Sequence, residues 1–517
     1  MFRIPTTTKI SRSRKTVGRG LIIITMTFSL PYKDVITYSQ VTNLHLTVFS
    51  ALIVFASLAF VFLIQNGKQN RKKVPPLAPV GILESMEGMS TNAPFFLQDM
   101  LKATGSDIIR LSLPIYGGAY AVGDPTAIRA IFTDKTSEKP AQVYAPIDYV
   151  TGGASVATRG NTKEWRSARK CLMYSFSGSE VNRMNRICTD QVNFWIKNRL
   201  EPSIQKNESF DPTAEMIMLT FNTILEAAFE YPEVVDYKEY AKFIHELNVS
   251  LKEFAGRHNC NPFRKYYGFL LSEYREAVEA SAEVMKFAVN ILETYRKNPN
   301  KSKNKTVIRM IVENDKYASD KERLSDIIIM ILAGHETTGT TLSTTLILLA
   351  KHPEVAEKLR GELLLMDESK RSSRSGYLHH VIRESKRLVP VAASTSVRIT
   401  GRSFLFKNGS IVIPKGAICF LSPMLAHHHK ETFKDPENFR PERWEDESKE
   451  MHDALMSFAV GSRDCLGKAL ALAELYSVLP KLVIDYKFEV EKEGELTNFL
   501  SLKYVGSRLK TTRIEFD

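Results

Sequence analysis

One short segment, Phe458 to Gly467, restricts the fold and chemistry of this 517-residue chain more than any other. It reads Phe-Ala-Val-Gly-Ser-Arg-Asp-Cys-Leu-Gly and places Cys465 between two glycines, with Arg463 two residues before it. Glycine lets a backbone approach a flat ligand closely, because it has no Cβ. The helix expected from Lys468 onward would offer N–H groups that stabilise a thiolate. The segment therefore predicts that Cys465 is the thiolate ligand of a haem iron and that Arg463 pairs with a haem propionate.

The pattern Phe-x-x-Gly-x-Arg-x-Cys-x-Gly resembles the cysteine-ligand loop of the cytochromes P-450, and every fixed position is filled. The resemblance implies haem b, iron protoporphyrin IX, as the cofactor, with Phe458, Arg463 and Gly467 in contact with it. A lone cysteine is more often an inert buried side chain. We expect this of the remaining cysteines, which are Cys171, Cys188, Cys260 and Cys419.

Residues 325–349 are apolar nearly all round, which predicts a buried helix, but the segment from Ala333 to Thr340 interrupts the pattern. Glycine costs a helix about 1 kcal/mol relative to alanine, and an unpaired buried carboxylate costs more. An interruption with this cost indicates a functional site in the helix rather than a packing feature. It resembles the A/G-G-x-D/E-T motif of the family's long central helix. By that resemblance Glu336 and Thr337 are catalytic and guide protons to dioxygen.

Trp165 and Arg169 are four residues apart and, on their own, would be an ordinary helix pair. At this place in the chain they resemble the family's W-x-x-x-R, whose side chains contact a haem propionate. Gly160 departs from that pattern, because it lies five residues before the tryptophan where the family usually has three. Arg398 is a further propionate candidate.

Glu384 and Arg387 lie on one face of a predicted helix, where a carboxylate and a guanidinium can pair. A pair of this kind on the surface stabilises little. With the segment Phe439 to Trp444, however, it resembles the family's E-x-x-R and P-E-R-W motifs, which implies a buried structural ion network of Glu384, Arg387 and Arg443. Because adjacent side chains diverge, we do not expect His427 to His429 to hold a metal.

The positive charge of the chain lies at its N-terminus. Residues 1–73 contain 11 Lys/Arg and one acid, whereas the rest contains 59 Lys/Arg and 57 Asp/Glu. The balanced body gives no support to nucleic-acid binding. Residues 44–64 lack charged side chains and are long enough for a transmembrane helix, with a buried core helix as the alternative.

We therefore expect a basic leader (1–43), a transmembrane anchor (44–64), a basic and proline-rich linker (65–80) and a catalytic domain (81–517). The lysines and arginines after the anchor predict that the body faces the cytosol, as in microsomal members of the family at the endoplasmic reticulum membrane. The acid-free leader resembles a transit peptide, so a mitochondrion or plastid is the alternative unless translation starts at Met26. Lys468 and Ala469 replace the paired arginines that mitochondrial members tend to carry. This favours a flavoprotein NADPH reductase as electron donor over a ferredoxin.

The fold implied is mainly α, a cytochrome P-450 fold with small β regions preceded by a single transmembrane helix. Helical spacing covers 211–229, and 404–413 predicts a hairpin with an Asn-Gly turn. The function implied is that of a haem-thiolate monooxygenase, which inserts one oxygen atom from O₂ into an apolar substrate (a lipid, sterol or terpenoid) with NADPH-derived electrons. Two alternatives remain open, a haem-thiolate isomerase or dehydratase that acts on peroxides without a reductase, and a non-enzymatic haem-binding sensor. The expected pocket walls are Ile329, Met330, Ala333, Val391 and Ala392.

Overall fold

The structure, a computed structural model, describes residues 74–113, 119–232, 234–258, 261, 263–298, 304–315, 317–393, 396–498 and 501–515. The predicted leader and anchor, part of the linker and Cys260 lie outside these residues. Within the described ranges, no helix combines the length and the apolar character that a membrane span requires.

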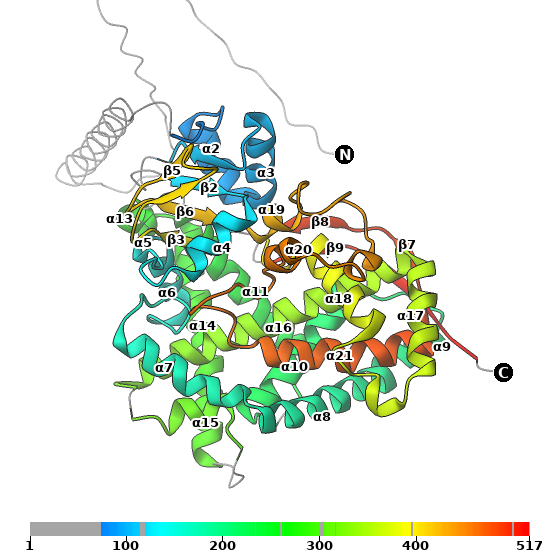
Figure 1. Cartoon of the computed structure of the whole chain (residues 1–517). Helices are drawn as coiled ribbons and strands as arrows, with labels where there is room; N and C mark the ends of the chain where they lie inside the picture. The colour runs from blue at the N-terminus through cyan, green and yellow to red at the C-terminus, as the bar shows by residue number, and fades with distance from the viewer. Residues whose placement is uncertain are drawn as a thin grey trace, which may run out of the picture. The chain divides into compact units, whose positions relative to one another are not determined.

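Most of the described chain is helical, and the helices surround the long helix α16 (Asp320–Lys351) (Figure 1). The other α-helices are α2 (Ile82–Thr91), α3 (Ala93–Thr104), α4 (Pro125–Thr133), α5 (Ala141–Tyr144), α6 (Asp148–Thr151), α7 (Lys163–Met173), α8 (Gly178–Trp195), α9 (Glu201–Gln205), α10 (Pro212–Phe229), α11 (Tyr237–Leu251), α13 (Arg264–Tyr267), α14 (Ser272–Lys297), α15 (Val307–Val312), α17 (Pro353–Leu365), α18 (Gly376–Leu388), α19 (Pro423–His427), α20 (Lys449–Ala454) and α21 (Lys468–Asp485).

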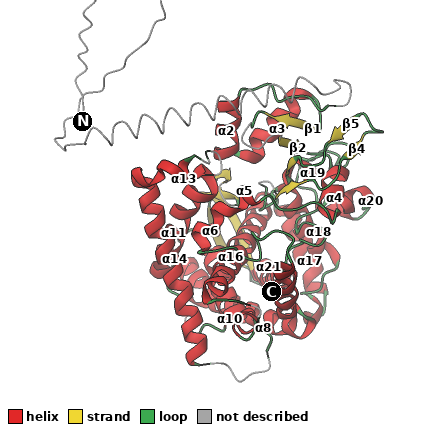
Figure 2. Ribbon diagram, turned by 90° about the vertical axis from the view of Figure 1, so that its left-hand side faces the viewer, coloured by secondary structure: helices red, strands yellow, loops and turns green. Residues whose placement is uncertain are grey.

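The strands form small sheets that take up a minor share of the fold, as Figure 2 shows in yellow. They are β1 (Ile108–Leu111), β2 (Ala119–Val122), β3 (Ser396–Ile399), β4 (Phe404–Phe406), β5 (Ile411–Ile413), β6 (Ile418–Leu421), β7 (Tyr486–Lys492), β8 (Glu495–Asn498), β9 (Leu502–Val505) and β10 (Arg508–Arg513). The largest sheet has the order β1-β2-β6-β3, in which β2 and β6 are parallel and the other neighbours antiparallel. The pairs β4–β5, β8–β9 and β7–β10 are antiparallel. The mainly helical fold with small sheets is confirmed, and the predicted Asn-Gly hairpin is β4–β5.

Helix α16 packs closely against α10. The N-terminus of α10 is capped by Asp211, whose carboxylate accepts the N–H groups of Thr213 and Ala214. At the crossing, a Cβ on Gly339 would lie 2.5 Å from Cα of Ile217, so glycine lets the two backbones touch. Part of the small-residue interruption in α16 therefore serves helix packing.

Two apolar cores lie along α16. One contains its N-terminal half with α8, α10, α11 and α14, and the other contains its C-terminal half with α17, α18 and α21. Between them, residues of the middle of α16 line a cavity. The helix is therefore fixed at both ends by packing, while its middle is left for a ligand.

Candidate active site

A cavity of about 460 Å³ is lined by the middle of α16, by the segment after α18 and by the loop that carries Cys465. Its wall is mostly apolar. The predicted pocket residues all lie on it, namely Ile329, Met330, Ala333, Val391 and Ala392.

Cys465 lies in the loop before α21, with its side chain exposed on the cavity wall. Its N–H donates to the carbonyl oxygen of Phe458 at 2.9 Å, which closes the loop. Burial raises the pKa of the Cys465 thiol, while the N–H groups of Gly467 and Lys468 and the guanidinium of Arg169 act in the opposite direction. Donors that stabilise a thiolate are thus already in place at the start of α21. Among the described cysteines, no other lines this cavity.

The two glycines of this loop have different roles. Gly461 has φ +85°, and a Cβ there would lie 2.6 Å from the carbonyl oxygen of Phe132, so this glycine makes a turn against α4. Gly467 lines the cavity, and a Cβ there would meet no atom within 4 Å. The open space at Gly467 leaves room for a flat cofactor to approach the backbone, whereas Gly461 is explained by the turn and not, as the sequence suggested, by the cofactor.

Positive charge is concentrated at one part of the cavity. Lys139, Arg169 and Arg463 line it, and Arg398 lies beside them, bound to the Ser396 hydroxyl and the Val397 carbonyl. Burial, with Arg398 and Arg169 nearby, lowers the pKa of Arg463 to about 10. Burial and the three arginines also lower the pKa of Lys139.

Asp464 pairs with Arg169, but within the described ranges no carboxylate pairs with Lys139, Arg398 or Arg463. Buried charge of one sign is costly unless an anion joins it. The two carboxylates of haem are such an anion, so these residues fit the cofactor. Lys139 could not be predicted from the sequence, because a single lysine in a loop forms no pattern.

The loop before α7 orients Arg463. Thr162 caps the helix by accepting the N–H of Trp165 at 3.1 Å. The Arg463 guanidinium stacks 3.7 Å from the centre of the Trp165 ring and donates to the carbonyl of Arg159 and the side chain of Asn161. The unusual spacing of Gly160 therefore belongs to a loop that binds Arg463.

Phe458 also lies on the cavity wall, and two ammonium groups flank its ring. Lys386 Nζ lies 4.9 Å and Lys468 Nζ 5.8 Å from the ring centre. Burial, with Arg383 and other cations nearby, lowers the pKa of Lys386 to about 7. Lys386 is therefore only partly protonated at neutral pH, and the positive charge that favours a negative sulfur comes from Lys468 and Arg169.

The two predicted catalytic residues occupy different places. Thr337 lines the cavity, and its hydroxyl donates to the Ala333 carbonyl at 2.8 Å. Glu336 is buried behind the wall, where its Oε1 accepts the Ser501 hydroxyl at 2.7 Å and the Lys503 ammonium at 2.9 Å. Burial would raise the pKa of Glu336, but the Lys503 ammonium and the hydrogen bond from Ser501 hold it below its usual value. The sequence placed Glu336 on the helix but gave no indication of these partners.

Glu384 is fully buried and is the centre of the predicted ion network. Its two oxygens accept both Nε and Nη2 of Arg387, at 3.0 and 2.9 Å, and Nε of Arg443 at 2.9 Å. Trp444 Nε1 and the backbone N–H of Arg440 donate to it as well, each at 3.0 Å. The carboxylate thus accepts five hydrogen bonds, which satisfies a charge that would otherwise be costly to bury.

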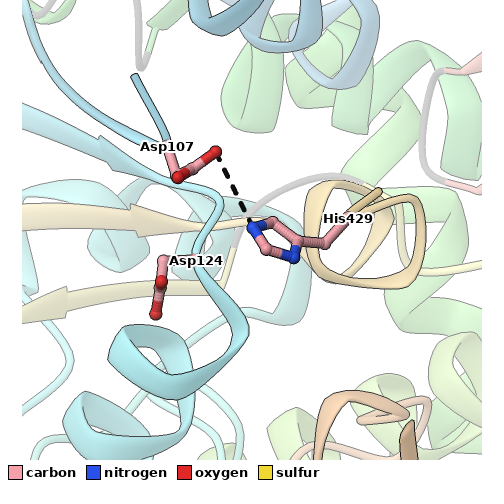
Figure 3. A group of neighbouring side chains, drawn as sticks. All are labelled: Asp107, Asp124 and His429. Carbon is pink, nitrogen blue, oxygen red and sulfur yellow. Dashed lines mark ion pairs between the residues drawn. The ribbon is translucent and has the colours of Figure 1, made fainter. Parts of the chain in front are cut away.

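The three adjacent histidines point to different partners. His427 Nε2 accepts the N–H of Met456 at 3.0 Å, and His428 Nε2 donates to the Leu388 carbonyl at 2.9 Å. His429 turns toward Asp107, at 3.8 Å (Figure 3).

Asp107, Asp124 and His429 bring their ligand atoms within 4.8 Å of one another (Figure 3). Protein groups already occupy these side chains, because Asp107 also binds the Lys407 ammonium at 2.8 Å and Asp124 accepts the N–H of Ala127 at the start of α4. His429, Lys407 and their charges hold the pKa of Asp107 well below its usual range. We interpret the group as an ion-pair cluster that fastens three segments together.

The cavity thus brings together a cysteine sulfur, an apolar wall and, among the described residues, three cations without a carboxylate partner, and this set of side chains fits a haem. The chain matches the Cytochrome P450 family over residues 80–516 and belongs to this family of oxidoreductases. Members bind haem and receive electrons from a redox partner.

Known proteins that resemble the chain include the Cytochrome P450 monooxygenase traB of Penicillium crustosum, 27% identical over 68% of this chain and 72% of its own length. Cytochrome P450 2C16 of Oryctolagus cuniculus is 27% identical over 67% of this chain and 73% of its own. The Cytochrome P450 monooxygenase BOT4 of Botryotinia fuckeliana is 37% identical over 35% of each chain. The crystal structure of the cytochrome P450 CYP102L1 superposes with a TM-score of 0.69 at 20% identity, over 86% of this chain and all of that one.

Replacing Arg387 by alanine tests the ion network. We expect a loss of about 3–5 kcal/mol in the free energy of unfolding, because a buried carboxylate loses a two-point partner. Lys370→Ala is the matched control, since Lys370 and Asp367 have the same i,i+3 spacing but are 70% and 71% exposed. This control should lose no more than about 1 kcal/mol. Equal losses in the two variants, measured by chemical denaturation, would contradict the role assigned to the network.

Proposed function

We propose that the protein is a haem-thiolate monooxygenase, which inserts one oxygen atom of O₂ into an apolar substrate. The observation that carries the proposal is the single cavity that Cys465 and Thr337 share, with apolar side chains on its remaining wall. Substrate, O₂, NADPH and a proton would give hydroxylated substrate, water and NADP⁺. Two of the relatives bear the name monooxygenase, which supports the same reaction.

Haem b would be held by the sulfur of Cys465 and by contact with Phe458 and Gly467. Its propionates would be bound by a group of side chains that comprises Trp165, Arg169, Arg398, Arg463 and Lys139. When bound, haem with a thiolate ligand supplies the binding and reductive cleavage of O₂, because the thiolate donates electron density to the iron.

The protein's own part in the reaction is to hold the substrate and to move protons. The Thr337 hydroxyl reaches the cavity and can turn from the Ala333 carbonyl to donate to a ligand there. Glu336 immediately precedes Thr337 in the sequence. Because its pKa is lowered, Glu336 is ionised and can take up a proton from outside the cavity. In this proposal Glu336 collects protons and Thr337 passes them on.

The cavity wall indicates the class of substrate. Ile329, Met330, Ala333, Val391 and Ala392 offer methyl and methylene groups and no side-chain hydrogen-bond donor. A site of this kind selects by shape and apolar area. We therefore propose a lipid, sterol or terpenoid-like substrate.

We propose a flavoprotein NADPH reductase as the electron donor, with a ferredoxin as the alternative. The support is Lys468 and Ala469, which stand where mitochondrial members tend to have paired arginines. Because Lys468 opens α21 beside Cys465, a partner docked at this helix end would lie close to the thiolate.

We propose that the protein is anchored in the endoplasmic reticulum membrane with its catalytic domain in the cytosol. The first support is the uncharged run 44–64. The second is the group of exposed apolar side chains that could contact a membrane, which are Leu83, Tyr266, Phe269 and Leu270. Import into a mitochondrion or plastid is the alternative.

The position of the domain can be checked on the intact chain by mapping glycans. The N-x-S/T sequons of the chain begin at Asn207, Asn248, Asn300, Asn304 and Asn408. A cytosolic domain leaves all of these asparagines without glycan. A glycan on any of them would contradict the proposed orientation, and a cleaved leader would favour the organelle alternative.

The proposed reaction is tested with the intact protein, NADPH and reductase under ¹⁸O₂, using lipids, sterols and terpenoids as substrates. We expect one labelled oxygen atom in the product and none without NADPH. The control omits the reductase and supplies substrate hydroperoxides. Rearrangement of these with no NADPH use would contradict the monooxygenase and favour an isomerase or dehydratase, and haem binding without O₂ uptake would favour a sensor.

A further inference from the structure

We propose that Lys503 is a positioning residue, which with Ser501 latches the carboxylate of Glu336 behind the cavity wall until substrate moves the β8–β9 hairpin. The proposal rests on the monooxygenase function above and deepens it, because it names the residues through which substrate would control proton uptake. Three sets of contacts support it.

The first set is the latch itself. Lys503 belongs to β9 and Ser501 directly precedes that strand, and both donate to the same oxygen of Glu336, at 2.9 and 2.7 Å. The Lys503 side chain is 24% exposed, whereas that of Glu336 is 11% exposed. The pair therefore joins a nearly buried acid in α16 to an ammonium group that reaches solvent.

The second set shows that the charge of Glu336 depends on Lys503. The other titratable groups that face it are His335 on α16 and Tyr240 on α11. Burial lowers the pKa of His335, and its Nδ1 donates to the Ile331 carbonyl, so it is neutral. Burial raises the pKa of Tyr240, so the phenol is neutral as well. In the described part of the chain, Lys503 is the ion-pair partner of Glu336, and without it burial would favour the neutral acid.

The third set ties the latch to the substrate wall. Leu502, between the two latch residues, donates its N–H to the Val391 carbonyl at 2.9 Å, and Val391 lines the cavity. The Leu502 side chain is buried in a small cluster with Val389, Ala393 and Met424. A substrate that displaces the segment after α18 therefore displaces the hairpin, and with it the two donors that hold Glu336. Release would let the carboxylate turn toward Thr337.

Lys503→Met removes the ammonium but keeps most of the side-chain volume, and Lys503→Arg restores the charge. The matched control is Lys487→Met on β7, where Lys487 pairs with exposed Glu489. We would measure NADPH oxidation and hydrogen peroxide with and without substrate. In peroxide formation NADPH supplies two electrons to O₂, and NADPH and solvent supply its two protons.

We expect Lys503→Met to oxidise NADPH faster than wild type without substrate, with peroxide as the product, and to lose several-fold stimulation by substrate. Lys503→Arg should regain the stimulation, and Lys487→Met should behave as wild type. The acidic limb of the pH–rate profile should move to higher pH in Lys503→Met, because burial then raises the pKa of Glu336. An unchanged ratio of rates with and without substrate, or a uniform fall of both, would overturn the latch.

A melting experiment tests the ion pair without turnover. In wild type the pKa of Glu336 is lowered, so the pair stabilises the fold above the unfolded pKa of about 4 and the benefit is lost as pH falls. In Lys503→Met burial raises the pKa, so ionisation at neutral pH destabilises. The Tm difference between the two proteins should therefore widen from about pH 4 to pH 7. The same comparison on a Glu336→Gln background should be flat.

A pH-independent Tm difference would overturn the pairing. If wild type consumes no O₂ with NADPH, the proposed function fails and the latch has no role. If wild type is active and Lys503→Met matches it in rate ratio and pH profile, only the latch fails.

Discussion

The carboxylate of Glu384 is the interaction on which the site depends. It holds Arg387, and Arg387 in turn donates to the carbonyl oxygens of His427 and Pro436. The imidazole of His427 accepts the N–H of Met456, two residues before Phe458, whose carbonyl accepts the N–H of Cys465. A series of hydrogen bonds, buried as far as Met456, thus connects α18 to the cysteine loop and holds the loop that carries the sulfur against the fold.

Charge is distributed unevenly around the cavity. Lys139, Arg398 and Arg463 are gathered on one part without paired acids among the described residues, whereas the wall at α16 is apolar apart from hydroxyl groups. The one acid of that part of the helix, Glu336, is kept behind the wall by Lys503. The cations suit a flat dianionic cofactor held at its edge, and the apolar wall suits an apolar substrate. Glu336, the proposed group for proton uptake, lies behind the wall and is separate from both.

Features whose residues are contiguous could be predicted from the sequence. The cysteine loop brings Cys465, Gly467 and the N-terminus of α21 together within a few consecutive residues. Glu384 and Arg387 are neighbours on one helix face. Helices were predicted well for the same reason, with 211–229 and 325–349 found as Pro212–Phe229 and Asp320–Lys351.

Features that depend on distant segments could not be predicted. Lys139 and Lys503 are single lysines without a pattern, and they matter only because the fold brings them to the cavity and to Glu336. Gly461 and Gly467 look alike in the sequence, but contact with Phe132, far away in the chain, explains only the first. The hydrogen-bond partners of Glu336, Ser501 and Lys503, likewise come from the β8–β9 hairpin, far from α16 in the sequence.

The direct test of Cys465 as the haem ligand is the difference spectrum of the reduced, carbon-monoxide-bound protein. Wild type should show a Soret band at the red-shifted position of thiolate ligation, and Cys465→Ala should lose it while Cys419→Ala, which alters a cysteine buried away from the cavity, should keep it. Absence of the red-shifted band from folded, haem-loaded wild type would show that another group binds the iron and would contradict the thiolate site.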